Sequence, residues 1–307
     1  MSRFVNIPPA DYSRSAFAAF SSQRARFDLD DARAMMWMAQ LAYETDAPET
    51  IAEIGPLWGF KPLQILRARG RAIDARAIIG ERDDCKVIAF TGTDPAVASN
   101  LITNVRFRLS LENTHQGFQN AIDAVWPQIG LQIRTSRRPL FFTGHSLGGA
   151  LAVLAAEKTF RNGLTPAAVY TFGMPRLGGP GFADRYNANL GDRTYRLVHG
   201  GDLIASIPQA ILRVSPPARI PFQHVGRLLK CASGEKFDRA AQLSPVGCND
   251  PTVLAVVREN LRNRVIAALA GRLLTLTGPG MLGPLYALLP FSIRDHLPDR
   301  YRHALEP

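Results

Sequence analysis

Hydrophobic and polar residues recur along the chain with two different periods. Apolar residues at helical spacing predict a helix over 28–44, with Asp28 or Asp30 as its N-cap. Two short apolar runs at 75–79 and 86–90 then flank a charged turn. This arrangement predicts a β-hairpin.

Further along the chain, short apolar runs alternate with amphipathic segments. A helix is predicted over 117–126, and Pro127 is expected to end it. The compact apolar run at 140–143 predicts a buried strand, and 150–160 has the spacing of a helix. A second cycle follows, with a strand, a helix and a strand expected at 167–172, 181–189 and 195–199.

Strands that alternate with helices predict an α/β fold with a mixed, mostly parallel central sheet and helices on both faces. The chain has 307 residues, of which 46% are hydrophobic and 20% charged, so it can bury a large core. Because no linker or repeat interrupts the pattern, we expect a single domain over 1–307.

The turn between the strand at 140–143 and the following helix carries the first chemical signal. It reads Gly-His-Ser-Leu-Gly over 144–148, and glycine on either side of Ser146 allows a sharp turn that exposes the hydroxyl. A helix N-terminus behind the serine favours developing negative charge. We therefore expect Ser146 to be a nucleophile and the backbone N–H of Leu147 to be an oxyanion donor.

Several further motifs occur in one order along the chain, and together they resemble the class 3 lipases, which include the fungal triacylglycerol lipases. The similarity extends from about Asp30 to His303. It implies an α/β-hydrolase fold, hydrolysis of lipid-like carboxylic esters, and Thr93 as the second oxyanion donor. Thr91 and Leu101 replace the usual Arg and Trp, which leaves interfacial activation open. The motifs are Phe90–Thr93, Asn100–Asn104, His115–Phe118, Thr171–Gly178, His199–Ile204 and Asp295–Tyr301.

The base and the acid are chosen from chain order and from these motifs. In α/β-hydrolases the order is serine, acid, histidine, which excludes His115 and His145. His296 lies in a segment similar to the family's closing Asp-His motif and is preferred over His224.

For the acid, Asp202 follows a predicted strand end and is preferred over Asp192. Asp295 is adjacent to His296 and is expected to be a solvated or capping residue, because it would have to fold back onto the neighbouring ring. The expected mechanism is acyl transfer through Ser146, His296 and Asp202, and it needs neither a metal nor an organic cofactor.

The chain is basic, with 36 Lys and Arg against 26 Asp and Glu and a net charge of +10. Such a surface favours anionic partners, so peripheral contact with an anionic lipid surface is predicted beside the ester or lipid substrate. The arginines are scattered, for instance at Arg67 and Arg76, and no basic tail is present, so nucleic-acid binding is not expected. No obligate protein partner is indicated.

Cysteine usage and targeting signals indicate where the protein resides. Cys85, Cys231 and Cys248 form no CxxC pair, and we expect reduced thiols in preference to a bridge between the last two. The first residues lack an unbroken apolar core, and the uncharged stretch at 273–293 is interrupted by Gly and Pro. The expectation is a cytoplasmic protein or one exported by a non-classical route.

Asp202 and His296 stand 94 positions apart, and we predict a helical insertion at about 231–290 between them. Within it, 251–274 has amphipathic helical spacing, and packing on the domain is favoured over resting on anionic lipid. The apolar segment at 281–291 is expected to line an acyl pocket or to act as a second lid. A lipase or esterase is the preferred interpretation; phospholipase A activity and a catalytically vestigial lipid-binding protein are the alternatives.

Overall fold

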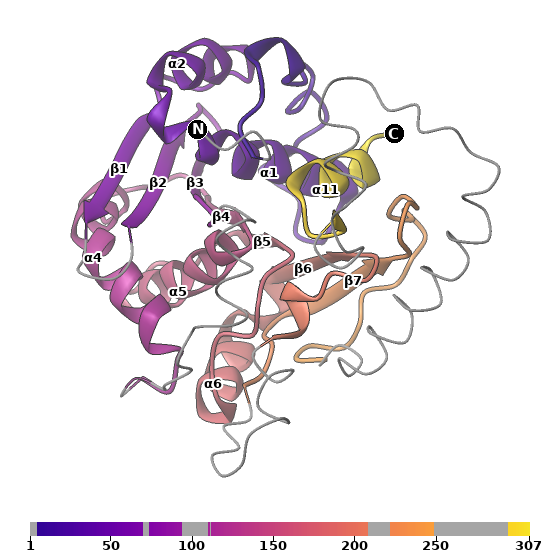
Figure 1. Cartoon of the computed structure of the whole chain (residues 1–307). Helices are drawn as coiled ribbons and strands as arrows, with labels where there is room; N and C mark the ends of the chain where they lie inside the picture. Colours follow the sequence, from indigo (N-terminus) through magenta and orange to yellow (C-terminus); the bar gives the residue numbers. More distant parts are fainter. Residues whose placement is uncertain (1–4, 70–73, 94–109, 111, 208–221, 249–293) are drawn as a thin grey trace, which may run out of the picture.

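The computed structural model describes residues 5–69, 74–93, 110, 112–207, 222–248 and 294–307. A seven-stranded sheet forms its centre, and its strands lie side by side in the order β1 to β7 (Figure 1). The strands are β1 (Gln64–Arg69), β2 (Asp74–Glu81), β3 (Lys86–Phe90), β4 (Leu140–His145), β5 (Ala168–Phe172), β6 (Thr194–His199) and β7 (Arg227–Cys231).

The sheet is mixed and mostly parallel, which confirms the prediction. β1, β2 and β3 are antiparallel neighbours, and the predicted hairpin pairs Ala77 with Phe90. From β3 to β7 every neighbouring pair is parallel. Parallel strands carry their carboxyl ends to one edge of the sheet, where the connecting turns can assemble a site.

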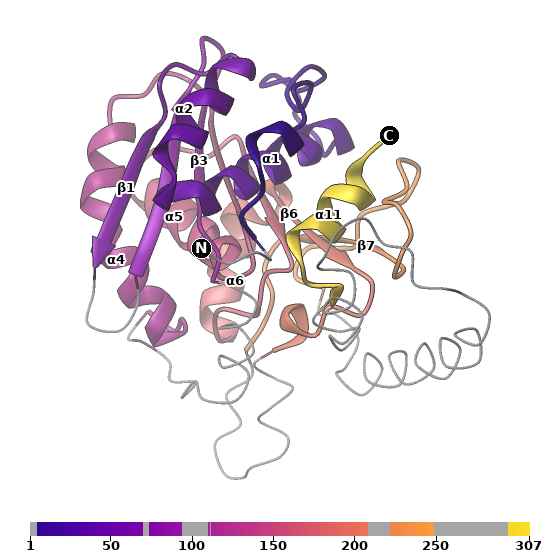
Figure 2. The ribbon, with the colours of Figure 1, turned by 45° about the horizontal axis from the view of Figure 1, so that its top comes forward.

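Helices cover both faces of the sheet, as predicted (Figures 1 and 2). α1, α2 and α11 pack on one face, and α4, α5 and α6 on the other. The helices are α1 (Leu29–Leu41), α2 (Pro48–Leu57), α4 (Gln116–Ile133), α5 (Leu147–Arg161), α6 (Pro180–Leu190) and α11 (Pro298–Leu305), with 3-10 turns at Pro9–Asp11, Ala42–Asp46, Gly191–Arg193 and Ile204–Ser206.

Strand alternation divides the buried residues between two cores. On β4, Phe141 joins the core under α1 and α11, whereas Phe142 joins the core under α4 and α5. Successive side chains of a strand point to opposite faces, so a strand buried on both faces is apolar throughout. This explains why β3 and β4 appear in the sequence as compact apolar runs.

The helix predicted over 28–44 is present, whereas the predicted end at Pro127 is wrong. Asp28 caps α1, since its carboxylate accepts the backbone N–H of Asp30 at 2.8 Å. α4 continues through Pro127 to Ile133, although proline removes one helical hydrogen bond. Its buried face continues through Val125, Ile129 and Ile133, and packing of this face offsets the local cost.

The predicted insertion at 231–290 lies largely outside the described residues. Its first part, 232–248, forms turns and irregular chain after β7, with no helix in these described residues. The amphipathic segment at 251–274, the uncharged stretch at 273–293 and the predicted acyl-pocket segment at 281–291 all lie outside. Among the described helices, none combines the length and the hydropathy that crossing a bilayer requires.

Candidate active site

Ser146 lies at the sharp turn from β4 into α5. Its backbone has φ 57° and ψ −129°, a conformation that costs energy for a residue with a side chain. Gly144 and Gly148 make the turn possible, because a Cβ at position 144 would collide with the backbone of Gly148 and one at 148 with the carbonyl of Phe90. The strained turn presents the serine at the end of a parallel strand, the setting of a nucleophile elbow.

His296 joins the serine to an acid. Its Nε2 lies 2.9 Å from Ser146 Oγ, and its Nδ1 lies 2.8 Å from Asp202 Oδ2. All three side chains are buried, with exposed fractions of 1–2%. The structure therefore brings together the three residues predicted as nucleophile, base and acid, from the turns after β4 and β6 and the segment before α11.

Asp202 lies in the turn after β6 and accepts four hydrogen bonds. Oδ1 accepts the backbone N–H groups of Ile204 at 2.8 Å and Ala205 at 3.3 Å, and Oδ2 accepts the Tyr301 hydroxyl at 2.6 Å beside His296. Burial, together with the Asp202 charge, raises the pKa of Tyr301 well above its usual value, so this hydroxyl stays protonated and donates. These donors hold the carboxylate in a fixed orientation.

Gly173 provides space for the His–Asp pair. It follows β5 with φ +60°, and a Cβ there would lie 2.6 Å from Asp202 Oδ2 and 2.9 Å from His296 Nδ1. Position 173 therefore requires glycine for two reasons: its backbone is left-handed, and a side chain there would collide with the His–Asp pair.

Asp295 is not solvated, which corrects the expectation from its position beside His296. It is 2% exposed; Oδ2 accepts the backbone N–H of Gly201 at 2.9 Å, and Oδ1 accepts the Ser233 hydroxyl at 2.9 Å. It also lies 3.8 Å from His199 Nδ1. Its side chain turns away from the neighbouring imidazole and joins the base segment to the turn that carries Asp202.

The other candidate bases have different partners. His224 Nε2 donates to the backbone oxygen of Ala205 at 2.8 Å, and burial lowers its pKa well below the usual value. His115 caps α4 by accepting two backbone N–H groups, and burial lowers its pKa to about 4. Asp192, the alternative acid, pairs with Arg227 at the surface. None of these three lies in hydrogen-bond contact with Ser146 or His296.

Both predicted oxyanion donors lie beside this turn. Leu147 is the first residue of α5, where backbone N–H groups have no acceptor within the helix. Thr93 follows β3, and the pairing of Phe90 with Gly144 places the end of β3 alongside the turn that carries Ser146. Thr93 is half-buried, and its role as a donor stays a prediction.

Thiol, imidazole and carboxylate side chains are the groups that could bind a metal ion. Cys85 and Cys231 are free thiols, and burial raises the pKa of both to about 12. Within the described ranges, no group of three or more His, Cys, Asp or Glu side chains is arranged to hold a metal ion.

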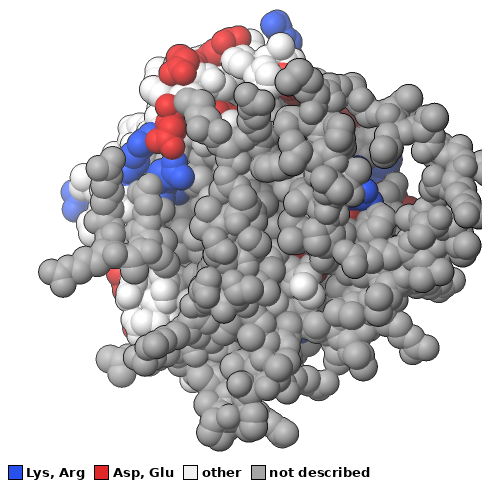
Figure 3. Space-filling view, in the orientation of Figure 1, with Lys and Arg blue, Asp and Glu red and all other residues white. Residues whose placement is uncertain are grey.

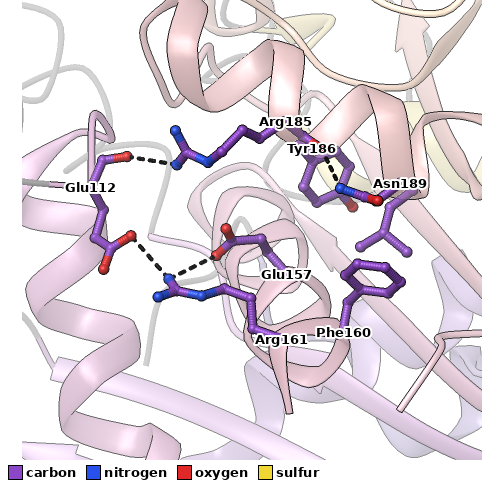
Figure 4. Close-up of a pocket in the computed structure, with 8 residues that line it drawn as sticks. Glu112, Glu157, Phe160, Arg161, Arg185, Tyr186 and Asn189 are labelled. Atoms are coloured by element: carbon purple, nitrogen blue, oxygen red, sulfur yellow. Dashed lines mark hydrogen bonds and ion pairs between the residues drawn. The ribbon is translucent and has the colours of Figure 1, made fainter. Parts of the chain in front are cut away.

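A surface cleft of about 430 Å³ lies away from the serine, between α5 and α6 (Figure 4). Arg161 pairs with Glu112 across it at 2.9 Å and with Glu157 on its own helix at 3.8 Å. Arg185 donates to the backbone oxygen of Glu112 at 3.3 Å. Ser146 stands at the other end of α5, about 20 Å away along the helix axis, so the cleft belongs to the packing of α5 on α6.

Acidic and basic side chains of the described residues lie next to each other on the face seen in Figure 3. Arg67 and Arg76, for example, both pair with Asp46, at 2.9 and 2.6 Å. These two arginines are thus partly neutralised, and the predicted contact with an anionic lipid surface stays a prediction.

The mostly parallel sheet and the sharp turn between β4 and α5 are those of an α/β-hydrolase fold. Among solved structures, the lipase of Rhizopus microsporus var. chinensis is similar over 76% of this chain and 84% of its own, at 20% identity and a TM-score of 0.55. At that identity the likeness concerns the fold.

Sequence comparison gives a related family. The family described as Lipase (class 3) matches residues 87–211, a range that contains the end of β3, the serine turn and Asp202. The chain is thus similar to the class 3 lipases over these residues, and the matched range includes five of the six motifs that resemble the family.

The relatives are distant and are matched in part. Lipase ZK262.3 of Caenorhabditis elegans is 27% identical over 66% of this chain and 63% of its own length. The secreted mono- and diacylglycerol lipase 1 of Fusarium solani is 35% identical over 32% and 30%, and the chloroplastic phospholipase A1-Igamma1 of Arabidopsis thaliana is 34% identical over 28% and 20%. The chain thus spans less than two thirds of the length of these relatives.

Proposed function

We propose that the protein is a serine carboxylic-ester hydrolase that cleaves lipid-like esters such as acylglycerols. One observation supports this most directly: His296 lies between Ser146 and Asp202, with 2.9 and 2.8 Å between the hydrogen-bonding atoms. A serine hydroxyl is a weak nucleophile by itself, and an adjacent, oriented base activates it. The match of residues 87–211 to the class 3 lipases and the names of the matched relatives support the lipid substrate.

In the proposed mechanism His296 Nε2 accepts the proton of the Ser146 hydroxyl as Oγ attacks the ester carbonyl carbon. The imidazolium then gives this proton to the leaving alcohol, and an acyl-enzyme remains on Oγ. Water, activated by the same nitrogen, releases the acid. Asp202 holds Nδ1–H and stabilises the positive charge on His296 in both steps.

Negative charge develops on the carbonyl oxygen during each attack. We assign its stabilisation to the backbone N–H of Leu147 and to Thr93. The N-terminus of α5 adds a favourable dipole at this position. Loss of one such donor from a hydrolase typically lowers kcat by about 10² to 10³.

Phospholipase A activity is the second candidate. The net charge of +10 favours anionic interfaces, and one matched relative is named a phospholipase A1. Both candidates use the same ester chemistry, and the substrate distinguishes them.

The test measures hydrolysis of p-nitrophenyl butyrate, p-nitrophenyl palmitate, a diacylglycerol emulsion and anionic phospholipid vesicles by wild type and Ser146→Ala. We expect turnover of one or more esters by wild type, loss of turnover in the variant, and labelling of Ser146 by a fluorophosphonate probe. The preferred substrate assigns esterase, lipase or phospholipase activity. An inactive, unlabelled wild type that still binds vesicles would instead support the vestigial lipid-binding alternative.

A further inference from the structure

We infer that Tyr43 and His145 form a buried positioning pair that holds the main chain of His296 and the turn at Gly92 in one geometry. The inference rests on the proposed function, since it assigns these residues to the alignment of the proposed base. Neither residue takes part in the proton transfers described above, but both lie beside the residues that do.

Two consecutive hydrogen bonds connect Tyr43 through His145 to the backbone of His296. The Tyr43 hydroxyl lies 2.7 Å from His145 Nδ1, and His145 Nε2 lies 2.7 Å from the backbone oxygen of His296. A carbonyl oxygen can only accept a hydrogen bond, so Nε2 carries the proton. In the neutral ring Nδ1 is then an acceptor, and the Tyr43 hydroxyl donates to it.

The surroundings keep His145 neutral. Burial and the neighbouring His296 lower the pKa of His145 well below its usual value. The two imidazole rings are stacked at a tilt, with centroids 4.7 Å apart. When His296 gains its proton during catalysis, it therefore has a neutral neighbour in place of a second cation.

The same pair contacts the strand end that carries the oxyanion candidate. A Cβ at position 92 would collide with the Tyr43 hydroxyl and would lie 2.5 Å from the backbone oxygen of His145. Thr91 Oγ1 in turn donates to the backbone oxygen of Ala42. The backbone at Gly92, next to Thr93, thus packs directly against Tyr43 and His145. This packing fixes the position of that backbone relative to Ser146 and His296.

Neither side chain is assigned a contact with substrate, because the Tyr43 hydroxyl and both ring nitrogens of His145 are engaged in hydrogen bonds within the protein. A defect in the pair should therefore change the rate of acyl transfer and leave substrate binding nearly unchanged. Misplacement of a reacting group by about 1 Å costs on the order of 10²-fold in rate. We expect about 10- to 100-fold lower kcat when the pair is broken.

The first variant is Tyr43→Phe, which removes one oxygen atom. Its matched control is Tyr186→Phe, because the Tyr186 hydroxyl is also buried and contacts Thr194 Oγ1 at 2.8 Å, away from the serine. We expect both variants to remain folded, and Tyr43→Phe alone to show lower kcat and slower fluorophosphonate labelling of Ser146, with KM within about twofold. Equal kcat and equal labelling in the two variants would overturn the inference.

A second comparison uses His145→Phe and His145→Gln. Phenylalanine keeps a planar ring but donates no hydrogen bond to the His296 backbone, whereas the glutamine amide can still donate one. We expect His145→Gln to retain more kcat than His145→Phe at similar KM. A His145→Phe variant as active as wild type contradicts the assignment.

A direct measurement separates this inference from the proposed function. The ¹⁵N chemical shifts of His145 report its tautomer in wild type whether or not an ester is cleaved. We expect a protonated Nε2 and an unprotonated Nδ1. The opposite tautomer refutes the pair even in an active enzyme, whereas the expected tautomer in a protein that hydrolyses no ester refutes the proposed function and leaves the pair as a structural contact.

Discussion

Gly173→Ala should lower the proposed ester hydrolysis about 100-fold, while it destabilises the protein no more than the same change at a left-handed glycine away from the site. Its Cβ would lie 2.6 Å from Asp202 Oδ2, whereas ordinary contacts of a Cβ begin near 3.4 Å, so the carboxylate or the His296 ring must move by about 0.8 Å. A displacement of this size at a reacting group corresponds to a rate loss on the order of 10²-fold. The left-handed backbone adds about 1–2 kcal/mol of strain for alanine.

Gly163→Ala is the matched control for this change. Gly163 has φ +83°, so alanine there meets the same kind of backbone strain, but no atom lies within 4 Å of its Cβ. Thermal unfolding should show similar destabilisation of the two variants. Turnover of p-nitrophenyl butyrate should fall about 100-fold in Gly173→Ala alone. If Gly173→Ala keeps activity within twofold of the control, the crowding of the His–Asp pair has no catalytic consequence and the reasoning is wrong.

Three further predictions concern other parts of the chain. Tyr301→Phe removes a donor from the buried Asp202, so the free energy of unfolding measured in urea should fall by about 1–3 kcal/mol and kcat should fall with it; unchanged values contradict this. Pro127→Ala restores a helical N–H at an exposed position of α4 and should raise the free energy of unfolding by up to about 3 kcal/mol; a loss would be the contrary result. Because burial raises the pKa of Cys85 and Cys231 to about 12, Ellman's reagent should titrate these thiols slowly until urea unfolds the protein, and rapid native titration would refute their burial.

The sheet centre and the serine turn could be predicted because their signals are local. A buried parallel strand has to be apolar on both faces, and the turn that follows β4 needs glycine at 144 and 148. The order of strand, turn and helix is therefore visible in a few consecutive residues. The edge strands β1 and β7 were not anticipated: β1 carries charged residues, and the side chains of β7 alternate between half-buried and buried.

Long-range packing decided the features that the sequence analysis missed. Pro127 is a local signal for a helix end, but the continued apolar face of α4 outweighs it. Asp295 was expected to be a solvated or capping residue, and its partners, Gly201 and Ser233, could not be foreseen because they are 94 and 62 positions away. Chain order excluded His145 as a base but gave no indication of its contact with the His296 backbone, which spans 151 positions. No local pattern encodes such pairs.

Asp202 shows how the fold reconciles burial with chemistry. A carboxylate that is 1% exposed is expensive to keep charged unless hydrogen bonds replace its water. The turn after β6 supplies two backbone donors, α11 supplies Tyr301 and the preceding segment supplies His296. The first three donors fix the carboxylate before the reaction begins, and the fourth is the residue whose charge changes during it. The same hydrogen bond therefore stabilises Asp202 and orients His296. A change to either residue should affect both the stability of the buried carboxylate and the orientation of the imidazole.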